Sequence, residues 1–270
     1  MILDNERFLD FSQDARKMTK HEIPEIKPNS ILLFGDFRIQ SFKNKDITYL
    51  FSHKLKLAFL IILEHSRLGG IASQHFSSIM WPEKEEDKSK NLRGVIINHL
   101  RNIFKEMEGV ELIYDKGFFK IEIDPNLCYC DYARCHEIMN SSSTNKEKKD
   151  EIVQILSRGK FLKLADEPCI DSLKDSTEKL LVPFLLTEME KSFCANDYHV
   201  VLILCDALFN IDPINNEALY YTVQSLTKMN FTNEARRQFY LFSTEFEKIM
   251  GCSYKTSYND IVNGKIKTAK

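Results

Sequence analysis

A β-hairpin signal that follows three helical segments is the feature that most constrains the fold of this chain. Residues 110–123, VELIYDKGFFKIEI, hold two stretches rich in apolar and aromatic side chains. Asp115, Lys116 and Gly117 separate these stretches, and the glycine supplies the backbone freedom of a tight turn. Short strands are also expected at 30–42 and 46–51. Strands, three helices and a hairpin, in this order, are typical of an α+β winged helix-turn-helix with small antiparallel sheets.

Three helices are expected between these strands. Ser52 can cap a helix over 53–66, where apolar residues recur at helical spacing. A short second helix is expected near Ser73, whose hydroxyl can act as its cap, and Pro82 stops it. The third helix is expected over 88–107, behind the acidic run EKEED, which suits the positive end of a helix dipole.

The third helix is predicted to have one apolar and one polar face. At about 100° per residue, the buried side collects Leu92, Val95, Ile96, Leu100, Ile103 and Met107. The outer side collects Lys90, Asn91, Gly94, Asn98, Arg101, Asn102 and Lys105, with Lys88 and Arg93 nearer the flanks. The outer side is therefore basic and rich in amides, with a glycine where a side chain would otherwise hold the helix away from a partner.

This concentration of cations stands out because the whole chain has a formal net charge of -2. No carboxylate occurs between Lys88 and Lys105. Arginine pairs with guanine, asparagine pairs with adenine, and lysine neutralises phosphates. The residues therefore favour double-stranded DNA, with this helix in the major groove and Lys116 at the hairpin tip on the adjacent backbone or minor groove. The alternative is the solvated polar face of an ordinary amphipathic helix.

The second half of the chain is expected to be an all-α repeat domain. Residues 196–213 and 232–249 look alike at a spacing of about 36, near the tetratricopeptide period of 34. The polar run 141–150 is expected to be a loop between helices. The expected limits are a lead-in or linker over 1–29, the winged helix over 30–125, the repeat domain over 126–264 and a tail over 265–270.

Several segments in order carry a resemblance to a known family. They are IASQHFSSIMWPEKEEDKSKNLRGVIINHLRNIF, ELIYDKGFFKI, ILSRGKFL and NIDPINNEAL. The chain resembles the bacterial antibiotic-regulatory (SARP) transcriptional activators. In that family a response-regulator-like winged helix precedes a tetratricopeptide-like bacterial transcriptional activator domain. Gly94 and Ile97 depart from the pattern, because polar side chains often stand there in the family.

The resemblance implies a transcriptional activator that binds specific DNA upstream of promoters, often at direct repeats, and contacts RNA polymerase. The candidate polymerase contact is the acidic loop formed by Glu83, Glu85, Glu86 and Asp87; its alternative is a solvated turn. A dimer or a tandem arrangement on DNA would add affinity. We expect a cytoplasmic protein or the cytoplasmic end of a longer membrane-anchored sensor, since no apolar run approaches the ~20 residues of a membrane span.

Two rival functions follow from the same sequence. An enzyme is disfavoured because the phosphate-loop, dinucleotide, zinc-protease and serine-hydrolase motifs are missing. No cofactor is expected, and the cysteine cluster 128–136 lacks the paired spacing of zinc ligands, so reduced thiols and no metal are expected. The second rival is a helical-repeat scaffold whose winged helix docks partners other than DNA. The protein or effector that the repeats bind is not specified by the sequence.

Overall fold

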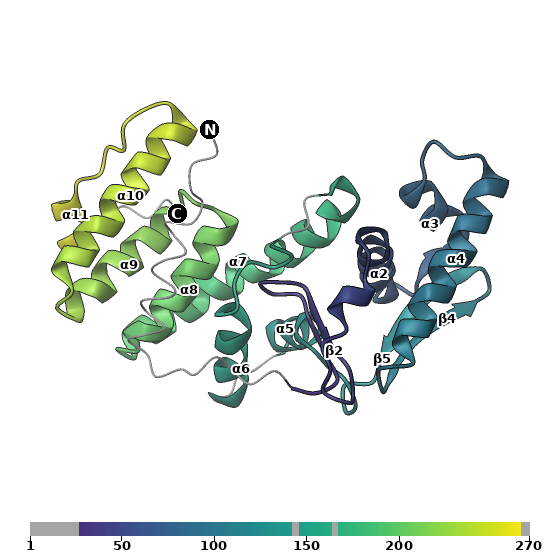
Figure 1. Ribbon diagram of the computed structural model, residues 1–270. Coiled ribbons are helices and arrows are strands. Elements are labelled where there is room, and N and C mark those ends of the chain that lie inside the picture. The colour runs from purple at the N-terminus through teal and green to yellow at the C-terminus, as the bar shows by residue number, and fades with distance from the viewer. Residues whose placement is uncertain (1–26, 142–145, 164–166, 266–270) are drawn as a thin grey trace. The chain divides into compact units, whose positions relative to one another are not determined.

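The computed structural model describes residues 27–141, 146–163 and 167–265 (Figure 1). Most of the expected lead-in and all of the tail but residue 265 lie outside the described residues. The described chain forms two compact units. The N-terminal unit holds residues 27–137 together with the later segment 161–177, and the helical unit holds 138–160 and 178–265, apart from the gaps above. The expected domain limits at 29/30 and 125/126 stay a prediction.

The first sheet of the N-terminal unit has the strand order β2-β1-β6. β1 (Ser30–Leu32) pairs antiparallel with β2 (Arg38–Gln40). On its other side, β1 pairs in parallel with β6 (Tyr129–Cys130), which comes about 100 residues later in the sequence. The expectation that the sheets would be antiparallel throughout was therefore wrong for this pair.

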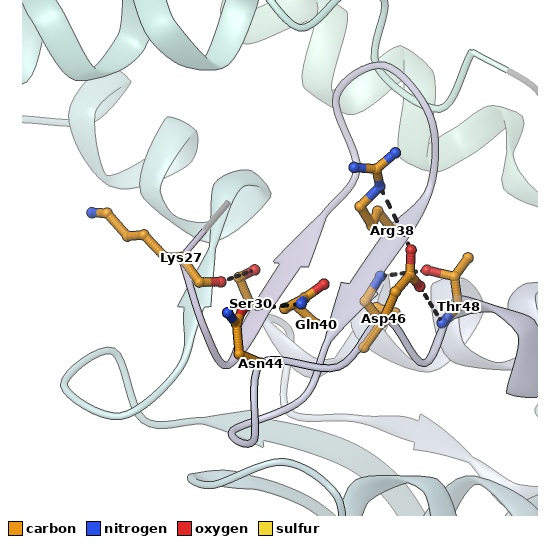
Figure 2. Close-up of polar contacts among 8 residues, drawn as sticks. Lys27, Ser30, Arg38, Gln40, Asn44, Asp46 and Thr48 are labelled. Carbon is orange, nitrogen blue, oxygen red and sulfur yellow. Dashed lines mark hydrogen bonds and ion pairs between the residues drawn. The ribbon is translucent and has the colours of Figure 1, made fainter. Parts of the chain in front are cut away.

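A network of short polar side chains supports the loop after β2 (Figure 2). The Asp46 carboxylate accepts a hydrogen bond from the Thr48 amide at 2.9 Å, and the Thr48 hydroxyl accepts one from the Ile39 amide at 2.9 Å. The hydrogen bond with Thr48 lowers the pKa of Asp46. Because Asp46 holds this turn, the segment forms the 3-10 helix η1 (Thr48–Leu50), and the strand expected over 46–51 was wrong.

α2 (His53–Ser66) is the central helix of the N-terminal unit. It begins as expected, with the Ser52 hydroxyl accepting a hydrogen bond from the Leu55 amide at 3.4 Å. After α2, Gly70 has φ of 112°, and an added Cβ there would lie 2.8 Å from the Phe119 carbonyl oxygen. Glycine at this position therefore lets β3 (Ile71–Ala72) approach the hairpin.

Two helices and a hairpin complete this unit. α3 (Ser73–Met80) has Ala72 at its N-cap position, so the expectation that the Ser73 hydroxyl caps it was wrong. α4 (Glu86–Phe104) follows the buried Trp81. β4 (Val110–Asp115) and β5 (Phe118–Ile123) form the expected hairpin, and the second sheet has the antiparallel order β3-β5-β4.

A buried carboxylate joins distant parts of the N-terminal unit. Asp131 begins α5 (Asp131–Met139) and is fully buried. Its carboxylate accepts hydrogen bonds from the Leu33 amide at 2.8 Å and from the Phe34 amide at 3.1 Å. These two amides follow β1 directly, so Asp131 satisfies buried donors at the end of the strand.

The helical unit consists of helices that pack around an apolar core. Its elements are α6 (Lys146–Leu156), the later part of α7 (Asp171–Cys194), which follows η2 (Pro168–Ile170), α8 (Tyr198–Ile211), α9 (Asn216–Lys228), α10 (Thr232–Met250) and α11 (Tyr258–Val262). The core includes Leu202, Leu219, Val223, Phe242 and Ile261. α6 shows that the loop expected over 141–150 was wrong from residue 146 onward, and 142–145 lie outside the described residues. That these helices form tetratricopeptide-like repeats stays a prediction.

Candidate nucleic-acid interface

α4 is held in the N-terminal unit by its buried side. Ile97, Leu100, Ile103 and Phe104 are buried there, and the Phe104 ring lies 6.1 Å from the Phe59 ring of α2. α4 also packs along α3 and β4 (Figure 1). The helix is therefore fixed along one side, and its opposite side is available to solvent.

Arg93 lies on the inner side of α4, although it was expected on a flank of the basic face. Its guanidinium donates hydrogen bonds to the Ser73 carbonyl oxygen at 2.8 Å and to the Ser77 hydroxyl at 2.7 Å. Both partners belong to α3. Arg93 therefore joins α3 to α4, and its charge is partly engaged there.

The buried seam of α4 is rotated relative to the sequence expectation. Leu92 and Val95, expected to be buried, are 40% and 53% exposed, while Ile97 is buried. Two polar residues lie toward the inside instead: Arg93 donates hydrogen bonds to α3, and the buried Ser89 donates its hydroxyl hydrogen to the Glu86 carbonyl oxygen of its own helix. A prediction that places only apolar residues inside cannot include them.

The outward face of α4 brings together most of the predicted DNA-binding residues. Lys88, Lys90, Asn91, Gly94, Asn98, Arg101, Asn102 and Lys105 are all exposed. Among the described residues, Lys88 pairs with a carboxylate, Glu85 at 2.9 Å, whereas Lys90, Arg101 and Lys105 have no ion pair. The Lys105 ammonium donates to the Asn102 amide oxygen at 3.0 Å. We call these eight residues, together with Leu92, Val95 and His99, the outward face.

Three members of the outward face were not selected as site residues from the sequence. Leu92 and Val95 were assigned to the core, and His99, which is exposed, was not assigned to either face. The signal that was available is the spacing itself, since Val95 lies one turn from Asn91, from Leu92 and from His99, and His99 lies one turn from Asn102.

The hairpin tip is fixed close to the helix pair. Lys116 and Gly117 have φ of 47° and 90°, the left-handed values of a two-residue hairpin turn, and Lys116 is exposed. The Gly117 carbonyl oxygen accepts a hydrogen bond from the Ser73 amide at 2.9 Å. The Arg101 guanidinium approaches the Leu112 carbonyl oxygen of β4 at 3.4 Å. Arg101 of α4 is thus tied to β4, and the backbone of the hairpin tip is tied to the start of α3.

The candidate polymerase-contact residues are divided between a loop and a helix. Glu83 and Glu85 precede α4, whereas Glu86 and Asp87 form its first turn, and all four are exposed. Glu85 pairs with Lys88, and Glu86 accepts a hydrogen bond from the Gln74 amide at 3.2 Å. Acidic groups at this end of α4 also stabilise the helix dipole.

The buried cysteines of the N-terminal unit are thiols in apolar surroundings. Burial raises the pKa of Cys128 to about 12 and raises the pKa of Cys130 further. No disulfide joins cysteines among the described residues. Across the described residues, no group of three His, Cys, Asp or Glu side chains is placed to hold a metal ion.

No described helix combines the length and the apolar character needed to cross a bilayer.

No protein-family model matches the sequence, and no curated protein does. Among solved structures, Mycobacterium tuberculosis EmbR in complex with a low-affinity phosphopeptide is similar in fold, with a TM-score of 0.53 and 13% sequence identity. The match covers 87% of this chain and 64% of the EmbR chain. It supports a mixed α+β fold of small sheets and helices, which is compatible with a winged helix followed by a helical part.

Proposed function

We propose that this chain is a sequence-specific DNA-binding transcriptional regulator. In this proposal α4 enters the major groove, and Lys116 at the hairpin tip contacts the adjacent backbone or minor groove. The observation that carries the proposal is the outward face of α4. It presents lysines, an arginine and three asparagines to solvent, and the carboxylate that pairs with it lies at its N-terminal end.

The chemistry of these side chains suggests a different role in DNA binding for each kind of residue. Lys90 and Lys105 are point charges that would neutralise phosphates, which adds affinity but little sequence choice. Asn91 and Asn98 offer an amide donor and acceptor in the arrangement that pairs with adenine N7 and N6. Arg101 would either read guanine or bind phosphate. Arg93, which is bound to α3, would orient α4 rather than contact DNA.

The proposal extends to transcriptional activation. Glu83 and Asp87 are exposed, and among the described residues neither side chain has a hydrogen-bond or ion-pair partner. They are the members of the acidic group best placed to contact RNA polymerase. Since the outward face carries few cations, a single copy would bind modestly, so two copies on DNA, as a dimer or in tandem, form part of the proposal.

Binding of the full chain to DNA, measured by fluorescence anisotropy at several salt concentrations, tests the proposal. Fragments selected from random DNA would serve as the specific probe. Lys90→Ala should lower the slope of log affinity against log salt by about one, on selected and random DNA alike. The matched control is Lys54→Ala, which removes an exposed lysine from the first turn of α2 and should leave the slope unchanged.

Asn98→Ala separates base recognition from phosphate binding. It should cost about 1–3 kcal/mol on the selected sequence, leave binding to random DNA nearly unchanged and relax the choice of base. If the full chain binds neither selected nor random DNA at low salt, the proposal fails. The winged helix would then be better explained as a docking module for another protein.

A further inference from the structure

The two exposed apolar residues of α4 lie within its polar outward face. Val95 is 53% exposed and Leu92 is 40% exposed. Scattered apolar residues on a surface are ordinary. These two are three residues apart on one helix, so they are neighbours on its surface. They therefore form a small apolar patch beside the asparagines of the same face.

The order of side chains along the helix is informative. Asn91, Val95 and Asn98 follow one another at spacings of four and three residues, so they form one stripe on the outward side. The stripe is about 10 Å long, because an α-helix rises 1.5 Å per residue. Since stacked base pairs are 3.4 Å apart, it is matched to about three successive base pairs.

Gly94 has no side chain that could block the approach of a partner to this stripe. A Cβ built at Gly94 would meet no atom within 4 Å, so the surface next to Val95 is open. The helix backbone can therefore approach base edges closely enough for a side chain as short as valine to reach them. A longer residue at position 94 would hold Val95 away from the groove.

The chemistry of the stripe favours one kind of base pair. Asparagine pairs with adenine through N6 and N7, and apolar side chains contact the thymine C5 methyl group, which is the apolar feature of the major groove. We infer that the stripe Asn91, Val95 and Asn98 reads a short run of A·T base pairs and that Val95 contacts a thymine methyl group. This inference rests on the proposed function and specifies the DNA that α4 would select.

Replacing thymine by deoxyuridine tests the inference, because the two bases differ by the methyl group alone. Each thymine of the selected site would be replaced singly, and the affinity of the full chain measured for every probe. At one position the replacement should weaken wild-type binding about fourfold, the factor that corresponds to ~0.8 kcal/mol for one buried methyl-sized group.

Val95→Ala completes a double-mutant cycle with this probe. The variant should bind the thymine site more weakly and should lose the difference between thymine and deoxyuridine at that position. Leu68→Ala is the matched control, since Leu68 is 84% exposed in the N-terminal unit but lies outside α4. It should bind all probes as the wild type does.

Two kinds of failure can be told apart. The inference is overturned, while DNA binding stands, if the selected DNA has G·C pairs where the stripe should contact it. The same conclusion follows if Val95→Ala keeps the full loss of affinity on replacing thymine by deoxyuridine. If the chain selects no DNA at all, both the proposed function and the inference fail, and Leu92 and Val95 would better suit a protein partner.

Discussion

Gly94 is a residue whose presence α4 itself does not explain. It lies in the interior of the helix, where glycine is about 0.5–1 kcal/mol less favourable than alanine. Its surroundings do not require a missing side chain, because an added Cβ would have open space around it. Nothing in the described chain therefore requires glycine at this position, whereas the close approach of DNA in the proposed function would favour it.

Gly94→Ala should separate stability from binding. We expect the variant to raise the free energy of unfolding by about 0.5–1 kcal/mol, since alanine loses less backbone entropy in a helix. We expect the same variant to bind the selected DNA more weakly, because the new methyl group stands between the helix and the groove. Denaturant titration and anisotropy on one sample would measure both effects. Unchanged DNA affinity would contradict the close approach.

The protonation of the single residue His136 should make the stability of the protein depend on pH. Burial, together with the neighbouring Arg67 guanidinium, lowers the pKa of His136 to about 4. An unfolded histidine titrates near 6.5, so between these values the unfolded state binds more protons. The free energy of unfolding should therefore fall as the pH falls through this window. The stabilising effect of a neutral His136 is fully present above about pH 6.5.

Denaturation midpoints between about pH 7 and about pH 5 would measure this effect, in a range where few carboxylates titrate. His136→Gln should be less stable than the wild type at the upper end but should show a flatter pH dependence. If the denaturation midpoint of the variant depends on pH as steeply as that of the wild type, another group takes up the proton.

At the scale of single elements, the hairpin was predictable and the orientation of α4 was only partly so. The turn at Lys116 and Gly117 follows from local chemistry, because glycine after a polar residue between two apolar stretches favours one kind of turn. The inward placement of the half-buried Arg93 depends on Ser73 and Ser77, which lie 20 and 16 residues earlier, and no local pattern contains that information. The exposure of the lysines, the asparagines and Arg101 on α4 was therefore predicted, whereas Arg93, Leu92 and Val95 were placed on the wrong side and His99 was not assigned.

The hairpin turn offers a variant that changes charge without changing conformation. Lys116 has φ of 47°, a value that asparagine tolerates better than most residues. Lys116→Asn should therefore keep the turn and the denaturation midpoint, while it lowers the salt slope of DNA binding by about one. If Lys116→Asn instead lowers the affinity for DNA by the same factor at every salt concentration, the slope is unchanged and Lys116 does not contact phosphate.

At the scale of the whole molecule, the N-terminal unit depends on residues well beyond the hairpin. β6 pairs with β1, and Asp131 accepts hydrogen bonds from the Leu33 and Phe34 amides. The later segment 161–177 belongs to the same unit, where the Leu162 amide donates to the Leu33 carbonyl oxygen at 2.9 Å. Sequence patterns locate helices and hairpins, but they do not show which distant segment completes a strand pair or a buried donor.

Two fragments would measure this dependence. A fragment of residues 27–125 should have a lower denaturation midpoint than a fragment of residues 27–177, since the shorter one leaves the amides after β1 without their carboxylate. An unsatisfied buried donor costs about 1–3 kcal/mol. Equal midpoints would show that the later segments add nothing to the stability of the N-terminal unit.

The outward face has a further consequence for how the molecule would search a genome. In the proposed function, a chain of net charge -2 whose outward face carries only a few lysines and arginines would be weakly attracted to arbitrary DNA sequences. Each chance encounter would therefore end quickly, and most copies would diffuse freely instead of being held on the bulk of the chromosome. Occupancy of a matched site would then follow the number of molecules in the cell closely, which suits control by synthesis and degradation.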